Sequence, residues 1–182
     1  MGRNMIHLLV LLVLMLSEGC SSSGHSAKTA KAYHPDGITL AYEAEPLLNI
    51  YDGRSHTLHL VVYQLDSPNG FRKLSGNADG LAVLLSASAF DQSVLNVSTY
   101  SIEPASADTI AIGRAENALW VGIAAGYNAM QPDEATRCYR IPQKHIRGVP
   151  LVSKSKDVPE PLDIRIRFTS NSIRENPPAH EH

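Results

Sequence analysis

Residues 162–168 read LDIRIRF, a strict alternation of apolar and charged side chains. Successive side chains of an extended strand point to opposite faces of a sheet, so this stretch has one apolar and one charged face. The apolar face carries Leu162, Ile164, Ile166 and Phe168. The pattern predicts a β-strand with one face buried and the other in solvent.

A second stretch, residues 119–127 (LWVGIAAGY), alternates in the same way. Its first face is apolar and consists of Leu119, Val121, Ile123, Ala125 and Tyr127. After Trp120, the other face holds only small residues, namely Gly122, Ala124 and Gly126. A face of small residues is suited to close packing by another element of the protein.

Five further segments have the composition and alternation of strands. They are residues 38–45, 57–65, 94–103, 108–113 and 137–141. Turn-forming residues separate the strands, at 52–53, 67–70, 104–107, 131–133 and 148–150. About seven to eight short strands with evenly spaced turns predict an all-β protein, a two-sheet antiparallel β-sandwich.

One segment departs from this alternation. Residues 80–90 (GLAVLLSASAF) place apolar side chains at positions 81, 84, 85 and 89, which is close to helical spacing. We therefore expect a short helical insertion between the second and third strands, within residues 71–90 and with a break at 77–80.

The N-terminal residues predict export from the cytoplasm. Residues 5–16 form an apolar run of twelve residues after Arg3, too short for a membrane span of about 20 residues, and typical of a signal peptide. Residues 16–20 (LSEGC) resemble a bacterial lipobox, which predicts lipidation of Cys20 after removal of residues 1–19. Ser17 and Glu18 depart from the usual lipobox, so an ordinary secretory signal is the alternative.

These features predict four parts of the chain. Residues 1–19 are the signal peptide, and residues 20–34 are the lipidated cysteine and a Ser/Gly-rich flexible tether. Residues 35–170 form the β-sandwich domain. Residues 171–182, which contain a Pro-Pro pair, are predicted to be a disordered C-terminal tail.

Charge and motifs argue against several classes of function. The net charge of −2 gives no reason to expect binding to nucleic acid, and no polybasic segment indicates binding to lipid headgroups. We find no catalytic motif. His56 and His59 point to opposite faces of a strand, and the terminal histidines 180 and 182 lack a third ligand, so we expect no catalytic residue, metal or cofactor.

The second cysteine, Cys138, stands alone if Cys20 is lipidated, so the mature protein has no intramolecular disulfide. Unpaired cysteines behave as small apolar residues, and we expect Cys138 to fill such a place in its strand.

The order of these features resembles a known family. Residues 48–55 (LNIYDGRS) precede the strand 60–65 (LVVYQL), a helical segment led by Phe71 follows, and residues 119–127 come late, before Ile141. Together with Cys20, this order is similar to the outer-membrane lipoprotein of the type VI secretion system, the TssJ/SciN/VasD family. The resemblance covers residues 38–168, although each motif alone is short.

The resemblance implies a transthyretin-like sandwich and an anchor in the outer membrane, facing the periplasm. It also implies that a loop between the first two strands docks on the periplasmic C-terminal domain of the inner-membrane protein TssM. By position this partner-binding loop consists of Asn49, Tyr51, Asp52, Gly53 and Arg54. Tyr51 and Arg54 are the expected anchors, because Tyr and Arg are enriched among interface hot spots.

Some alternatives stay open. The glycine- and proline-rich loop common in the family is replaced here by residues 49–56 without proline, so a plain hairpin turn is the alternative for residues 49–54. Further partners would be another lipoprotein of the complex or a peptidoglycan-binding subunit. A periplasmic lipoprotein that binds a small ligand or carbohydrate is the rival function. An enzyme would be favoured only by an open cluster of His59, His145 and an acid.

Overall fold

The computed structural model describes residues 34–129, 131–148 and 154–176. They belong to one compact unit, Lys31–His182. The predicted signal peptide, Cys20 and all of the predicted tether up to residue 33 lie outside the described residues, as do residues 177–182.

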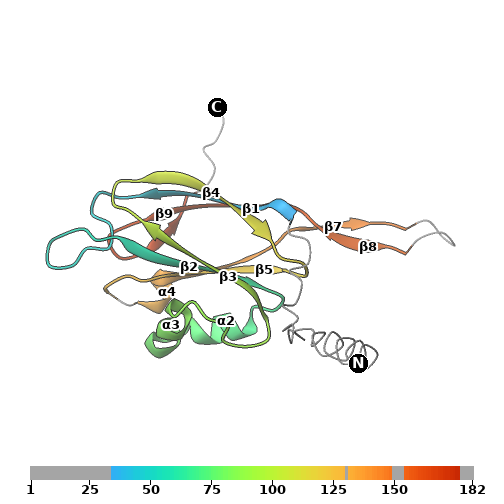
Figure 1. Ribbon diagram of the computed structural model, residues 1–182, viewed down its shortest axis with the longest axis horizontal. Helices are drawn as coiled ribbons and strands as arrows, with labels where there is room; N and C mark the ends of the chain where they lie inside the picture. The colour runs from blue at the N-terminus through green and yellow to red at the C-terminus, as the bar shows by residue number, and fades with distance from the viewer. Residues whose placement is uncertain (1–33, 130, 149–153, 177–182) are drawn as a thin grey trace, which may run out of the picture. The chain divides into compact units, whose positions relative to one another are not determined.

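Two four-stranded sheets face each other (Figure 1). The first sheet has the order β10-β9-β1-β4, with β1 at His34–Ala44, β4 at Ala107–Arg114, β9 at Leu162–Phe168 and β10 at Ile173–Glu175. The second has the order β3-β2-β5-β6, with β2 at Leu58–Leu65, β3 at Val94–Ile102, β5 at Trp120–Ala125 and β6 at Thr136–Arg140. A separate hairpin consists of β7 (Gln143–Ile146) and β8 (Lys156–Pro159). This arrangement confirms the predicted sandwich.

The stretch LDIRIRF forms β9, and its burial follows the predicted alternation. Leu162, Ile164, Ile166 and Phe168 are buried, whereas the acidic and basic residues between them are exposed. Strand β9 pairs with β1 in parallel, unlike the other strand pairs described. Parallel pairing needs a long crossover, and the whole second sheet lies between β1 and β9 in the sequence.

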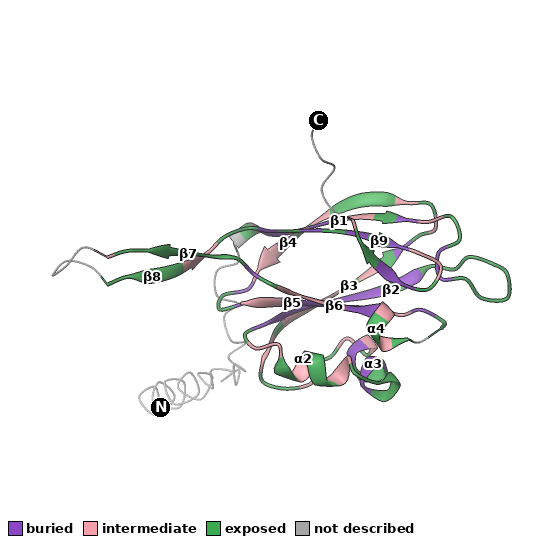
Figure 2. Ribbon diagram, turned by 180° about the vertical axis from the view of Figure 1, so that it is seen from behind, coloured by how far each residue is buried: buried purple, intermediate pink, exposed green. Residues whose placement is uncertain are grey.

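Except at His59, which is exposed, strand β2 is buried on both faces because it has a layer on each side (Figure 2). One face points to the first sheet, and there Gln64 joins the two layers. Its Nε2 donates to the carbonyl oxygen of Gly113 at 2.9 Å, and its Oε1 accepts from the backbone N–H of Ala115 at 2.7 Å. Both polar ends of this buried amide are thereby satisfied, as burial requires.

The helical insertion lies between β2 and β3, as predicted. It consists of α2 (Asn69–Leu74) and α3 (Ala78–Leu85), which cover the outer face of the second sheet (Figure 1). Asn77 caps α3, since its Oδ1 accepts from the backbone N–H of Gly80 at 2.8 Å. None of the helices in the described part of the chain has the length and apolar character to span a bilayer.

The small face of β5 receives this insertion. The ring of Phe71 lies directly over Gly122, where an added Cβ would be 2.6 Å from the ring. Next to it, the hydroxyl of Tyr63 donates to the carbonyl oxygen of Leu84 at 2.5 Å, and its ring contacts Phe71 edge-on. Close packing over Gly122 therefore joins the helices to the sheet.

Two elements differ from the predicted ones. Residues Pro132–Ala135 form a short helix, α4, where a turn was predicted; proline is favoured in the first turn of a helix. The β7–β8 hairpin was predicted only as a turn near residue 148. The four residues of β7 are all exposed, so this strand lacks the apolar alternation that would have revealed it.

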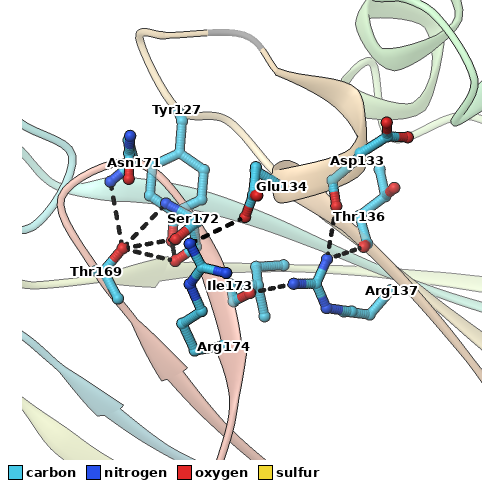
Figure 3. Close-up of polar contacts among 10 residues, drawn as sticks. All are labelled: Tyr127, Asp133, Glu134, Thr136, Arg137, Thr169, Asn171, Ser172, Ile173 and Arg174. Atoms are coloured by element: carbon cyan, nitrogen blue, oxygen red, sulfur yellow. Dashed lines mark hydrogen bonds and ion pairs between the residues drawn. The ribbon is translucent and has the colours of Figure 1, made fainter.

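The prediction of a disordered tail over residues 171–182 is wrong for its first part. Strand β10 pairs antiparallel with β9, and Ile173 is fully buried. Figure 3 shows the polar contacts that hold this segment. The hydroxyl of Tyr127 donates to the carbonyl oxygen of Ser172 at 2.7 Å, and the guanidinium of Arg137 donates to the carbonyl oxygen of Ile173. The predicted end of the sandwich at residue 170 therefore moves to at least residue 175.

Candidate functional site: the loop between β1 and β2

The predicted partner-binding loop lies between β1 and β2, in residues 45–57. Its base is held against the segment that follows β9. The backbone N–H of Glu45 donates to the carbonyl oxygen of Phe168 at 2.9 Å, and that of Ile50 donates to Ser170 at 3.0 Å. The position of the loop is therefore set by the first sheet.

Asn49 lies beneath this loop and not on its surface, since only 4% of it is exposed. Its Nδ2 donates to the carbonyl oxygen of Thr57 at 3.1 Å, and its Oδ1 accepts from the backbone N–H of Asn128 at 2.8 Å. Its φ of 46° lies in the left-handed region, which asparagine tolerates better than most residues. The geometry gives Asn49 a positioning role, although it was predicted among the contact residues.

The tip of the loop is a tight turn. Tyr51 and Arg54 exchange two backbone hydrogen bonds, of 2.9 and 3.0 Å. Between them Asp52 and Gly53 have φ values of 49° and 69°, the positive pair that a type I′ turn requires. The tip is thus a hairpin turn, the alternative considered for residues 49–54, and binding of a partner at this turn stays a prediction.

Apolar side chains gather on the outside of this loop. In the described residues, six large apolar side chains are exposed, and three of them are Leu47 (57%), Ile50 (38%) and Tyr51 (63%). The ring of Tyr51 also meets His56 edge-on at 6.1 Å, and Nδ1 of His56 lies 3.1 Å from the carbonyl oxygen of Arg54. Exposed apolar and aromatic side chains with a polar surrounding are typical of a protein-binding surface.

The structure thus brings four of the five predicted residues together at an exposed tip: Tyr51, Asp52, Gly53 and Arg54. Sequence reasoning missed Leu47 and Ile50, although both are apolar residues within a polar loop. It also missed Asn128, which lies 79 residues from its partner Asn49, and no local pattern signals such a contact.

The histidines do not form the cluster that would favour an enzyme. Nδ1 of His145 lies 2.7 Å from Oδ1 of Asp157 across the β7–β8 hairpin, and both side chains are exposed. His59 belongs to β2 in the second sheet. Across residues 34–129, 131–148 and 154–176, no group of three or more histidine, cysteine, aspartate or glutamate side chains is arranged to hold a metal ion.

Cys138 lies in β6, where it is half-buried and unpaired. Burial raises the pKa of its thiol, and the positive charge of Arg72 partly opposes this shift. The same arginine stacks on the ring of Trp120, with its guanidinium carbon 4.9 Å from the ring centre. Cys138 therefore fills a place at the edge of the second sheet, beside a cation–π contact.

This architecture defines a class of protein: a two-sheet sandwich with a helical insertion on one face and, at one end, an exposed loop with a hydrogen-bonded base. Residues 36–171 match the family model T6SS-SciN, described as type VI secretion lipoprotein, VasD, EvfM, TssJ. The chain therefore belongs to the family of type VI secretion lipoproteins. A search among curated protein sequences finds no match.

Solved structures share the fold. The chain is similar to Lip of Serratia marcescens, a membrane-bound component of the type VI secretion system, with 17% identity and a TM-score of 0.60 over 78% of this chain and 98% of that one. It is similar to the lipoprotein TssJ1 of Pseudomonas aeruginosa, with 17% identity and a TM-score of 0.53 over 78% and 97%. A structure described as the TssM C-terminal domain from EAEC matches with 12% identity and a TM-score of 0.55 over 77% and 97%.

Proposed function

We propose that this protein is a lipid-anchored structural component of the type VI secretion membrane complex. It tethers the complex to the outer membrane by binding the periplasmic C-terminal domain of a TssM-type inner-membrane protein. Membership of the lipoprotein family supports the assignment to the secretion system. The exposed tip of the β1–β2 loop, carried on a buried and hydrogen-bonded base, is the observation that supports docking.

In this proposal Cys20 carries the lipid. Several acyl chains on one residue hold a protein firmly, since each buried methylene contributes about 0.8 kcal/mol. From Cys20 to the start of β1 at His34 the chain has about 14 residues, which reach at most about 50 Å when fully extended. The domain would therefore stay near the periplasmic face of the outer membrane.

The partner would contact the tip of the loop. Tyr51 and Arg54 offer the aromatic ring and the guanidinium that dominate many interfaces, and Leu47 and Ile50 extend the apolar area. Asn49 holds the loop in one conformation before binding, which lowers the entropy cost of association. The protein acts by binding, and the proposal assigns it no catalytic group.

Two experiments test the parts of this proposal separately. Cys20→Ser should leave the domain folded and remove it from the outer-membrane fraction; a variant that still fractionates with outer membranes would contradict the anchor. In a pull-down with the partner's periplasmic domain, replacing residues 51–54 by a Gly/Ser turn should abolish capture. The base of the loop and Asn49 are left intact, so a folded variant that is captured as well as the parent would contradict the docking site.

A further inference from the structure

The β7–β8 hairpin projects beyond the two main sheets (Figures 1 and 2), and its described residues are exposed except for Gly148, Val158 and Pro159, which are half-buried. The proposed function makes no use of it. Its strands pair antiparallel, with Lys144 opposite Val158 and Ile146 opposite Lys156. Beyond Ile146, the backbone N–H of Gly148 donates to the side-chain hydroxyl of Ser155 at 3.0 Å and joins the two arms of the hairpin.

The hairpin is strongly basic, although the sequence has no continuous basic run. Its described residues, 143–148 and 154–159, carry four exposed basic side chains, Lys144, Arg147, Lys154 and Lys156, and one acidic one, Asp157. Four positive charges less one negative charge leave a net charge of +3, whereas the whole chain carries −2. Pairing of the two strands therefore brings together positive charges that lie apart in the sequence, between positions 144 and 156.

The two faces of the hairpin differ. Directly paired residues of an antiparallel sheet share a face. One face carries Lys144, Ile146, Lys156 and Val158, which we name the basic-apolar face. Ile146 is 44% exposed there, one of the six large apolar side chains exposed in the described residues.

The single acidic residue lies on the opposite face. Asp157 and His145 are directly opposite each other in the two strands, and Oδ1 of Asp157 lies 2.7 Å from Nδ1 of His145. Among the ion pairs of the described residues, none involves Lys144 or Lys156. The basic-apolar face thus combines uncompensated positive charge with exposed apolar surface.

The hairpin also lies at a particular end of the sandwich. Strand β1 begins at His34, where the chain arrives from Cys20, and it runs parallel to β9, with Ile38 opposite Leu162. Strand β8 leads directly into β9, so the hairpin and the start of β1 are at the same end. The β1–β2 loop follows the other end of β1, and Figure 1 shows these two features at opposite ends of the sheets.

We propose that the basic-apolar face of the β7–β8 hairpin lies on an anionic phospholipid surface. Lysine can keep its ammonium group at the headgroups while its stem and neighbouring apolar side chains enter the boundary of the acyl region. This contact would orient the domain on its membrane and direct the β1–β2 loop away from it. The orienting role rests on the proposed lipid anchor at Cys20. The contact of the hairpin with anionic phospholipid does not depend on that anchor.

The test uses residues 21–182, which include the whole compact unit but no acyl chain. Its binding is measured by cosedimentation with vesicles of phosphatidylethanolamine and phosphatidylglycerol, and with vesicles of phosphatidylcholine alone. We expect the protein to bind the anionic vesicles only, because anionic headgroups attract basic residues that lie within a Debye length of the surface. Added salt should weaken this binding, because it shortens the Debye length. Ile146→Ser should also weaken binding.

A charge-reversed pair, Lys144→Glu with Lys156→Glu, should lower binding by roughly tenfold or more. The matched control reverses two exposed basic residues elsewhere, Lys73 on α2 and Arg165 on β9, and should bind almost as the parent does. The contact is contradicted if the parent does not bind anionic vesicles, if both reversed pairs lose binding equally, or if the protein binds peptidoglycan and not vesicles. The measurement involves neither Cys20 nor the TssM-type partner, so its failure would leave the proposed function standing.

Discussion

The side-chain oxygen of Asn49 accepts a hydrogen bond from the backbone N–H of Asn128 at 2.8 Å. A second hydrogen bond, of 3.1 Å, joins the Nδ2 of Asn128 to the same oxygen. Asn128 follows β5 in the second sheet, whereas Asn49 follows β1 in the first. One buried amide therefore joins the two sheets beneath the exposed tip of the β1–β2 loop.

Asn49→Ala should lower the free energy of unfolding by about 1–3 kcal/mol, because partners of the buried amide lose their hydrogen bonds. The positive φ of residue 49 adds strain when alanine replaces asparagine. Urea unfolding measures the change. The matched variant Asn128→Ala keeps the backbone N–H that donates to Asn49 and loses only the side-chain donor, so it should cost less. A loss as large as that of Asn49→Ala would contradict the role given to the Asn49 side chain as acceptor for that N–H.

Gly122→Ala should destabilise the protein by about 1–3 kcal/mol through overpacking, since the new Cβ would stand 2.6 Å from the ring of Phe71. Thermal or urea unfolding detects this loss. Gly76→Ala is the control, because the nearest atom to its added Cβ is 3.5 Å away. Adding Phe71→Leu to Gly122→Ala should relieve part of the clash; equal stability of Gly122→Ala and the parent would contradict the close packing of α2 on β5.

Stability should fall in alkaline solution. Burial raises the pKa of Tyr63 to about 12 and that of Tyr139 to about 12, whereas tyrosine in an unfolded chain has a pKa of about 10. Above about pH 10 the unfolded chain has lost protons that the folded chain retains, so the free energy of unfolding decreases as the pH rises. The full contribution is present below about pH 10 and is lost towards pH 12.

Tyr63→Phe separates the effect of Tyr63 ionisation at high pH from the loss of the hydrogen bond that the Tyr63 hydroxyl makes. At neutral pH the variant should be less stable by about 1 kcal/mol, because the hydrogen bond to the carbonyl oxygen of Leu84 is lost. Between about pH 10 and 12 its stability should fall less steeply than that of the parent. Urea unfolding at a series of pH values gives both quantities, and an unchanged slope would show that the Tyr63 hydroxyl is not held in its neutral form.

The sequence predicted the elements whose burial follows a local period. LDIRIRF became β9 with its alternation intact, and the small face of β5 is closely packed, as predicted, with the ring of Phe71 over Gly122. Residues 80–90, with their helical spacing, lie partly in α3. Each of these signals depends on neighbouring residues only.

Elements that are held in place by residues far away in the sequence were not predicted. Strand β10 has three residues, and its place depends on β9, Tyr127 and Arg137. The exposed β7–β8 hairpin carries no buried face, so periodicity could not reveal it. The residues of the candidate site were inferred from the resemblance to the family, by their position in the chain. The buried role of Asn49 could not be inferred in this way, because it depends on Asn128 far along the chain.

The most direct test of the proposed docking is a calorimetric titration of residues 21–182 with the periplasmic C-terminal domain of the TssM-type partner. Tyr51→Ala combined with Arg54→Ala should weaken binding by about 2 kcal/mol or more, roughly thirtyfold, as loss of interface hot spots does. Val83→Ala removes an exposed apolar side chain on α3 and should leave the affinity unchanged. Equal affinities for the parent and the folded double variant would contradict the claim that the β1–β2 loop is the docking site.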